Sequence, residues 1–190
     1  MLLRWIGGGA LALLAIALFA SHPLFKRYRI PSESMEPTIA HGDKVNLDGG
    51  PDVHVGDIVV FHPPQGAAAF DVQCGNTPAA GEPCAMPADA SATVQFIKRI
   101  VAGPGDKVAF EDGHTILNGE RQAEPFTMPC GGGEACDFPR AITVPDGMYY
   151  MLGDNRGASD DSRFWGPVRK DWILGRVARC KAVYFFCSPA

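Results

Sequence analysis

One serine stands on a segment that its neighbours make stiff. Ser34 lies between Pro31 and Pro37. Each proline fixes its own φ and pushes the preceding residue away from the helical region, so Ser34 has few backbone conformations open to it. A nucleophile needs such rigidity, because a small misplacement of the attacking oxygen costs rate steeply. The segment alone is equally typical of an ordinary turn, so it predicts catalysis only together with other features.

A lysine inside an apolar run is the first of these features. Lys98 lies in residues 96–101, which are apolar and β-branched apart from Lys98 and Arg99 and are followed by the turn-forming residues 102–106. The pattern predicts a buried strand with Lys98 on the same face as Phe96 and Ile100. Burial there would lower the pKa of Lys98 and leave part of it as a neutral amine that can accept a proton.

A third feature is a polar segment at residues 153–166, which is dense in charged groups and turn formers but flanked by apolar runs. Long polar loops inside compact domains often carry function. Acyl transfer needs a nucleophile, a base within hydrogen-bond reach and donors for the developing oxyanion. A serine with a neutral lysine is a known variant of that arrangement.

Four blocks of residues follow one another between positions 30 and 177. They are Ser32-x-Ser34-Met35-x-Pro37-Thr38, then Gly56-Asp57-Ile58-Val59-Val60-Phe61, then residues 98–106, then Gly153-Asp154-Asn155-Arg156 with Ser159 and Asp161-Ser162-Arg163. In content and order they resemble bacterial type I signal peptidase. The resemblance implies a membrane-bound serine endopeptidase that removes N-terminal signal peptides from exported precursors through an acyl-enzyme, without a cofactor.

The resemblance also implies roles for single residues. Ser34 is expected to be the nucleophile and Lys98 the general base, while the Ser34 N-H and the Ser32 hydroxyl stabilise the oxyanion and Ser159 orients Lys98. Charged side chains around them are expected to support the site structurally: Arg99, Asp154, Arg156, Asp161 and Arg163. Family members often carry polar residues where this chain has Gly157-Ala158, so hydrogen bonds from that position are in question.

Substrate pockets in the family are shallow and apolar, and they accept small side chains at the first and third positions before the cut. The matching residues are equally ordinary core residues. They are Tyr28, Ile30, Met35, Ile39, Phe96 and Ile97. An extended substrate is expected to lie beside residues 30–31 and 96–97 as an added strand.

Composition bounds the remaining possibilities. The 190 residues, 46% of them hydrophobic, suffice for one domain of ordinary size with a core and a short appendage. The net charge is −4 and no basic stripe is present, so the sequence shows no sign of the positively charged surface that binds nucleic acid. The five histidines lie in separate contexts without zinc-ligand spacing, so no metal site is predicted.

Residues 1–27 are predicted to form an N-terminal membrane anchor. Residues 5–25 carry no formal charge except at a histidine, and their length fits a membrane helix. A cleaved secretory signal is the alternative. Lys26, Arg27 and Arg29 mildly favour a cytoplasmic domain by the positive-inside rule. The cysteines and the resemblance favour the outer, periplasmic face of a bacterial inner membrane, where the basic residues would meet anionic lipid.

Residues 28–190 are predicted to form a mainly β domain, a compact antiparallel sheet or barrel, with a Pro- and Gly-rich insertion at about 62–92. Asn118-Gly119 has the signature of a hairpin turn. The predicted strands are 44–47, 56–61, 93–101, 107–110, 116–121, 141–144, 148–152 and 174–186.

Six cysteines allow 15 pairings, among which the sequence does not choose. They are Cys74, Cys84, Cys130, Cys136, Cys180 and Cys187. A local disulfide within the insertion would join Cys74 and Cys84. The resemblance favours Cys130 with Cys136, because larger family members carry a disulfide in a similar place.

Three other functions compete with signal-peptide removal. One is a dedicated conjugation or pilin-processing peptidase of the same family. Another is a self-cleaving Ser/Lys repressor, which would need a DNA-binding helical domain before Ser34. The third is an inert binding module on the outer face, which has no chemical reason to keep Ser32, Ser34, Lys98 and Ser159 together.

Overall fold

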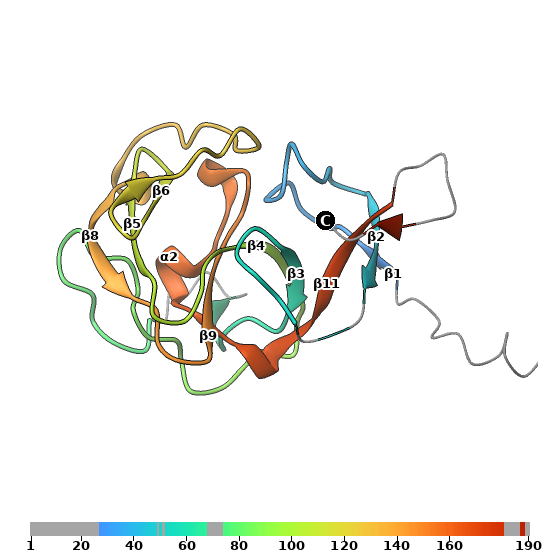
Figure 1. Cartoon of the computed structure of the whole chain (residues 1–190), viewed down its shortest axis with the longest axis horizontal. Helices are drawn as coiled ribbons and strands as arrows, with labels where there is room; N and C mark the ends of the chain where they lie inside the picture. The colour runs from blue at the N-terminus through green and yellow to red at the C-terminus, as the bar shows by residue number, and fades with distance from the viewer. Residues whose placement is uncertain (1–26, 49, 51, 68–73, 181–186, 189–190) are drawn as a thin grey trace, which may run out of the picture.

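The computed structural model describes residues 27–48, 50, 52–67, 74–180 and 187–188 (Figure 1). The predicted anchor therefore falls outside the described residues, apart from its last position. Within those ranges, no helix combines the length and the apolar character needed to cross a bilayer. What the structure describes is mainly β, as the sequence predicted.

The larger sheet is antiparallel throughout and has the order β1-β2-β11-β3-β4-β9-β10, with β12 paired to β11. Its strands are β1 (Arg27–Arg29), β2 (Lys44–Asp48), β3 (Ile58–Phe61), β4 (Phe96–Ala102), β9 (Met148–Leu152), β10 (Val168–Arg169), β11 (Ile173–Cys180) and β12 (Cys187–Ser188).

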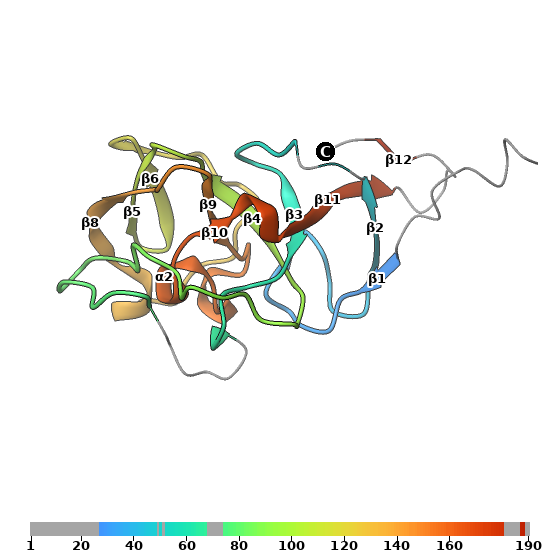
Figure 2. The ribbon, with the colours of Figure 1, turned by 90° about the horizontal axis from the view of Figure 1, so that it is seen from below.

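The smaller sheet has the order β7-β6-β5-β8. Its strands are β5 (Lys107–Glu111), β6 (His114–Leu117), β7 (Glu120–Arg121) and β8 (Phe138–Thr143). The predicted hairpin turn joins β6 to β7, and Asn118 and Gly119 both adopt positive φ, of 53° and 89°. Figures 1 and 2 show this sheet at one end of the molecule and β1, β2 and β11 at the other.

Strands β3 and β4 lie in the middle of the larger sheet and are covered on both faces. Every residue of β3 is buried, and so is β4 after Phe96. Ile97 packs in one core cluster with Ile30, Met35 and Ile39, while Ile100 packs in another with Trp165. This double coverage explains why β3 is a continuous apolar run in the sequence and why β4 is apolar except at Lys98 and Arg99.

The polar segment 153–166 is more ordered and more buried than a surface loop. It contains a 3₁₀ turn, η3 (Arg156–Ala158), and one turn of helix, α2 (Ser162–Trp165). Asp161 caps α2, because its carboxylate accepts a hydrogen bond from the Arg163 N-H at 3.3 Å. Two further 3₁₀ turns are η2 (Glu134–Cys136) and η4 (Lys170–Trp172).

Two disulfides join Cys74 to Cys84 and Cys130 to Cys136. The first closes part of the insertion, whose described residues form no strand beyond a bridge between Pro64 and Ser91. Cys180 lies opposite Cys187 in the register of β11 and β12.

Candidate active site

The serine and the lysine singled out in the sequence meet in the structure. Lys98 Nζ donates a hydrogen bond of 2.7 Å to Ser34 Oγ, although the two residues lie 64 positions apart. Ser34 is carried by the turn that follows β1, and Lys98 by the centre of β4. Both are buried, Lys98 with 4% of its surface exposed. If the amine were neutral, the same contact would let it accept the serine proton.

Burial sets the protonation state of Lys98. Loss of solvation lowers its pKa from 10.5 to about 8, and the nearby Asp161 and Asp160 carboxylates oppose part of that shift. A lysine with this pKa is neutral in an appreciable fraction of molecules at pH 7 to 8.

The turn that carries Ser34 is fixed at several points. The Ile39 N-H donates to the Met35 carbonyl at 2.9 Å, and the Met35 side chain is fully buried. The Ser34 carbonyl in turn accepts the Asn155 N-H at 3.1 Å. The nucleophile's segment is thereby attached to the polar segment 153–166.

Ser32 lies beside Ser34 on the exposed side of the turn. Its hydroxyl oxygen is 3.3 Å from Ser34 Oγ. At this distance a donor on Ser32 can reach an oxygen that forms next to Ser34 Oγ.

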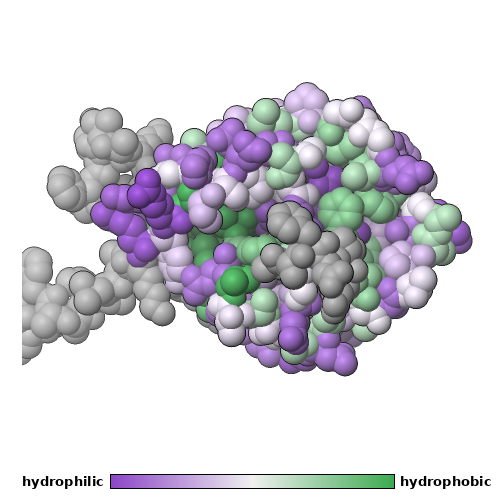
Figure 3. All heavy atoms as spheres, turned by 180° about the vertical axis from the view of Figure 1, so that it is seen from behind, coloured by the Kyte–Doolittle hydropathy of each residue, from purple (hydrophilic) through white to green (hydrophobic). Residues whose placement is uncertain are grey.

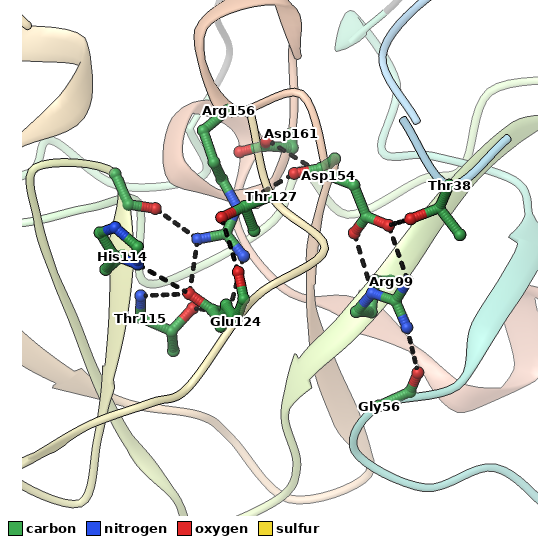
Figure 4. Close-up of polar contacts among 12 residues, drawn as sticks. Thr38, Gly56, Arg99, His114, Thr115, Glu124, Thr127, Asp154, Arg156 and Asp161 are labelled. Atoms are coloured by element: carbon green, nitrogen blue, oxygen red, sulfur yellow. Dashed lines mark hydrogen bonds and ion pairs between the residues drawn. The ribbon is translucent and has the colours of Figure 1, made fainter. Parts of the chain in front are cut away.

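Asp154 joins the segment of the nucleophile to the strand of the base (Figure 4). Its carboxylate accepts two hydrogen bonds from Arg99, at 2.8 and 2.6 Å, and one from the Thr38 hydroxyl at 2.5 Å. Arg99 also donates to the Gly56 carbonyl at 2.8 Å and stacks its guanidinium on the Phe126 ring at 4.0 Å. The ion pair is buried, so removal of either partner would leave an unpaired charge.

A second buried ion pair joins Asp161 to Arg163, with contacts of 2.8 and 3.0 Å. Burial by itself would raise the pKa of Asp161, but the charge and hydrogen bonds of Arg163 outweigh it and hold that pKa below its usual value. Arg163 also donates to the backbone carbonyls of Arg156 and Ala135, at 2.7 and 3.0 Å.

A third ion pair joins the polar segment to the smaller sheet (Figure 4). Glu124 accepts hydrogen bonds from Arg156 at 2.9 and 2.6 Å, and from the N-H and hydroxyl of Thr115, both at 2.9 Å. Arg156 also donates to the Gly113 carbonyl. Glu124 was not predicted as a site residue, because its partner Arg156 lies 32 positions away and forms no local sequence pattern with it.

A cavity of about 340 Å³ opens beside Ser34 and Lys98. Of the residues predicted for the substrate pocket, Phe96 and Ile97 line it. Ile30, Met35 and Ile39 do not, because they are buried in the core cluster behind Ile97. The lining is completed by Pro31, Ser32, Ala67, Gln95, Ala158 and Asp160. Figure 3 shows the molecule from behind, where hydrophobic surface gathers in a hollow between hydrophilic margins.

Comparison with known proteins agrees with this geometry. The family described as "Signal peptidase, peptidase S26" matches residues 2–181. The chain belongs to this family. It is 34% identical to "Probable signal peptidase I-1" of Synechocystis sp., over 86% of this chain and 72% of that protein. It is 28% identical to "Signal peptidase IB" of Staphylococcus aureus, over 93% of this chain and 87% of that protein.

A crystal structure of a signal peptidase I from Enterococcus faecalis V583 has a TM-score of 0.39 and 25% identity, and the match covers 66% of this chain and 96% of that one.

Ser159 lies behind the nucleophile's segment in this S26 peptidase, and its role of orienting Lys98 stays a prediction. Its hydroxyl is buried and makes no hydrogen bond to Lys98, but it lies close enough to Asp161 to help lower the pKa of that carboxyl group. It lies against Gly153, where an added Cβ would be 2.6 Å from the Ser159 Cβ and would also overlap the Ser34 carbonyl. Ser159 therefore contacts the backbone behind the nucleophile.

Within the described ranges, no three His, Cys, Asp or Glu side chains are grouped so as to hold a metal ion.

Gly157 and Ala158 are exposed, and an added Cβ on Gly157 would lie 2.6 Å from the Cys130 carbonyl oxygen. The close approach of the Cys130–Cys136 loop explains why this position carries glycine in this chain.

Proposed function

We propose that this peptidase removes signal peptides from exported precursor proteins, with Ser34 as nucleophile and Lys98 as general base. The observation that supports this most strongly is the 2.7 Å contact between Lys98 Nζ and Ser34 Oγ at a buried site. A pKa of about 8 for Lys98 supplies the neutral amine that the reaction needs.

The reaction proceeds in two halves. Neutral Lys98 takes the Ser34 proton while Oγ attacks the scissile carbonyl, and the resulting ammonium then gives that proton to the leaving amine. The acyl-enzyme is hydrolysed when Lys98 takes a proton from water and the hydroxide attacks the ester carbonyl. The ammonium then returns the proton to Ser34 Oγ, and the cleaved signal peptide departs with a free carboxyl group.

The developing oxyanion is stabilised by the Ser34 N-H and by the Ser32 hydroxyl. The 3.3 Å separation of the two hydroxyl oxygens supports this role for Ser32. Ser159 acts as a positioning residue. Its buried hydroxyl lies beside the Asp161 carboxylate, which also acts on the charge of Lys98, and it can donate there while its oxygen accepts from the Lys98 ammonium.

The substrate binds in extended form across the cavity beside Ser34. Phe96 and Ile97 form its apolar wall, and a volume of about 340 Å³ suits the small side chains that precede the cut. Ile30, Met35 and Ile39 support this wall from the core.

The enzyme acts on the outer face of a bacterial cytoplasmic membrane, anchored by residues 1–27. Residues 28–190 form the peptidase domain, with the insertion at about 62–92. Two disulfides suit an oxidising compartment. Arg27 and Arg29 are exposed on β1, at the end nearest the proposed anchor, where they can meet anionic lipid head groups.

A cleavage assay tests the dyad. The full chain in detergent is incubated with a precursor that carries Ala-x-Ala before the cut, and the parent is compared with Ser34→Ala and Lys98→Ala. Each variant is expected to lose about 10³-fold or more of kcat/KM. Matched controls are Ser91→Ala and Lys107→Ala, whose side chains are exposed away from the cavity. Undiminished cleavage by either dyad variant would refute the assignment.

A further inference from the structure

Asp160 is a carboxylate in the cavity that the proposed reaction does not use. It is half-buried and lines the cavity together with Ser34, Lys98 and Ala158. No hydrogen bond or ion pair within the described part of the chain engages its side chain. Asp160 was not predicted as a site residue, because the family resemblance rests on its neighbours Ser159 and Asp161.

Backbone geometry explains why Asp160 faces the cavity. Its neighbours Ser159 and Asp161 are both extended, with φ and ψ of −125° and 121° and of −152° and −168°. Successive side chains on extended backbone point in opposite directions. Ser159 and Asp161 are buried with 8% and 0% exposure, so the side chain between them points outward.

The charges around the cavity do not cancel when the enzyme is ready to react. Asp161 is paired with Arg163, and Asp154 with Arg99. Of the described residues that line the cavity, only Lys98 and Asp160 are ionisable. Lys98 must be neutral to act as a base, and the described lining of the cavity then holds one net negative charge, on Asp160.

Asp160 is ionised under those conditions. Burial and the nearby Asp161 raise its pKa to about 6, which is still below the value of about 8 for Lys98. At any pH at which Lys98 is largely neutral, Asp160 is therefore a carboxylate.

We propose that Asp160 selects substrates by charge, favouring precursors with a lysine or arginine next to the cut and disfavouring those with aspartate or glutamate there. A cationic side chain within two or three residues of the scissile bond would lie over the cavity and compensate its charge. An acidic one would face like-charge repulsion. The inference rests on the proposed function, since the substrate must occupy this cavity.

The test uses the full chain in detergent and a set of otherwise identical peptides with Ala-x-Ala before the cut. Each carries Lys, Gln or Glu at one of the positions that flank the cut, the two alanines excepted. At one or more of these positions, kcat/KM should be highest for the Lys peptide, lower for the Gln peptide and lowest for the Glu peptide. The kcat/KM of the Lys peptide should exceed that of the Glu peptide about tenfold. Asp160→Asn should bring that ratio close to one. Asp146→Asn, an exposed acid outside the cavity, should keep the parent's ratio.

Salt gives a second measurement that needs no variant. A ratio that arises from charge should shrink in the parent when ionic strength is raised to about 1 M, because the screening length falls to about 3 Å. Equal cleavage of the Lys and Glu peptides at every position, or an unchanged ratio in Asp160→Asn, would overturn charge selection and leave the proposed function intact. Failure to cleave any peptide, the Gln series included, would contradict both.

Discussion

Arg99 holds Asp154 through two hydrogen bonds, of 2.8 and 2.6 Å, across 55 positions of the chain. Arg99 is the residue next to Lys98 on β4, and Asp154 also accepts the Thr38 hydroxyl from the segment of Ser34. One carboxylate thus fixes the strand of the proposed base relative to the segment of the proposed nucleophile.

Asp154→Ala should destabilise the protein strongly. The change leaves the Arg99 guanidinium buried without its partner, and breaking a buried pair in this way costs about 3–5 kcal/mol. The free energy of unfolding, measured by denaturant titration in detergent, should fall by about that amount, and kcat should fall with it. Asp171→Ala removes the partner of Arg169 in an exposed ion pair and should change stability little. Equal losses in the two variants would contradict the role of Asp154.

Gly153→Ala should impair catalysis through geometry. An added Cβ would overlap the Ser159 side chain and the Ser34 carbonyl, so the nucleophile's segment must shift. A displacement of about 1 Å can cost about 10²-fold in rate, and kcat/KM should fall by that order. Gly103→Ala is the matched control, because its nearest atom would lie at 3.7 Å. Parent-like activity of Gly153→Ala would show that the close approach does not position Ser34.

Glu124 should make stability depend on acid pH. Burial by itself would raise the pKa of Glu124, but hydrogen bonds and charge from Arg156, with those from Thr115, lower it below 4.5. A lowered folded-state pKa contributes stability above the unfolded value, and this is lost as pH falls through the folded value. The difference in Tm between parent and Glu124→Gln should therefore be largest near pH 7 and shrink below about pH 4.5. A difference that stays constant down to pH 3 would contradict the ion pair.

Asp160→Asn should shift the pH dependence of cleavage. The charges that act on Lys98 come from Asp161, Asp160, Arg163 and Asp154, and the first two carboxylates raise its pKa. Loss of the Asp160 charge should therefore lower the pKa of Lys98 and move the midpoint of the kcat/KM profile to lower pH. The profile is recorded with the Gln peptide, to separate this effect from substrate charge. Asp146→Asn should leave the midpoint unchanged, and an identical shift there would exclude a local effect.

The sequence predicted the central strands and the pairing of serine with lysine because both leave local signals. Strands β3 and β9 are apolar throughout and β4 is apolar except at Lys98 and Arg99, and Ser34 and Lys98 stand in recognisable blocks. Strands β1 and β10 were missed, since three and two residues are too few to show a period. The predicted start of β3 at position 56 was two residues early.

Other features depend on packing between distant segments. Helix α2 is one turn long and was missed for that reason, although Asp161 before it is a suitable cap. Ile30, Met35 and Ile39 are close to the proposed nucleophile in sequence, but the turn directs them into the core. The Glu124–Arg156 pair leaves no local pattern in the sequence, because the two residues are 32 positions apart.

The pH dependence of kcat/KM for the parent enzyme tests the central assignment most directly. If a buried, neutral Lys98 takes the proton of Ser34, the rate with a neutral Ala-x-Ala peptide should rise with pH through a single ionisation near 8 and then level off. A profile that is flat between pH 6 and 10, or that rises only with the midpoint of an ordinary lysine near 10.5, would contradict it.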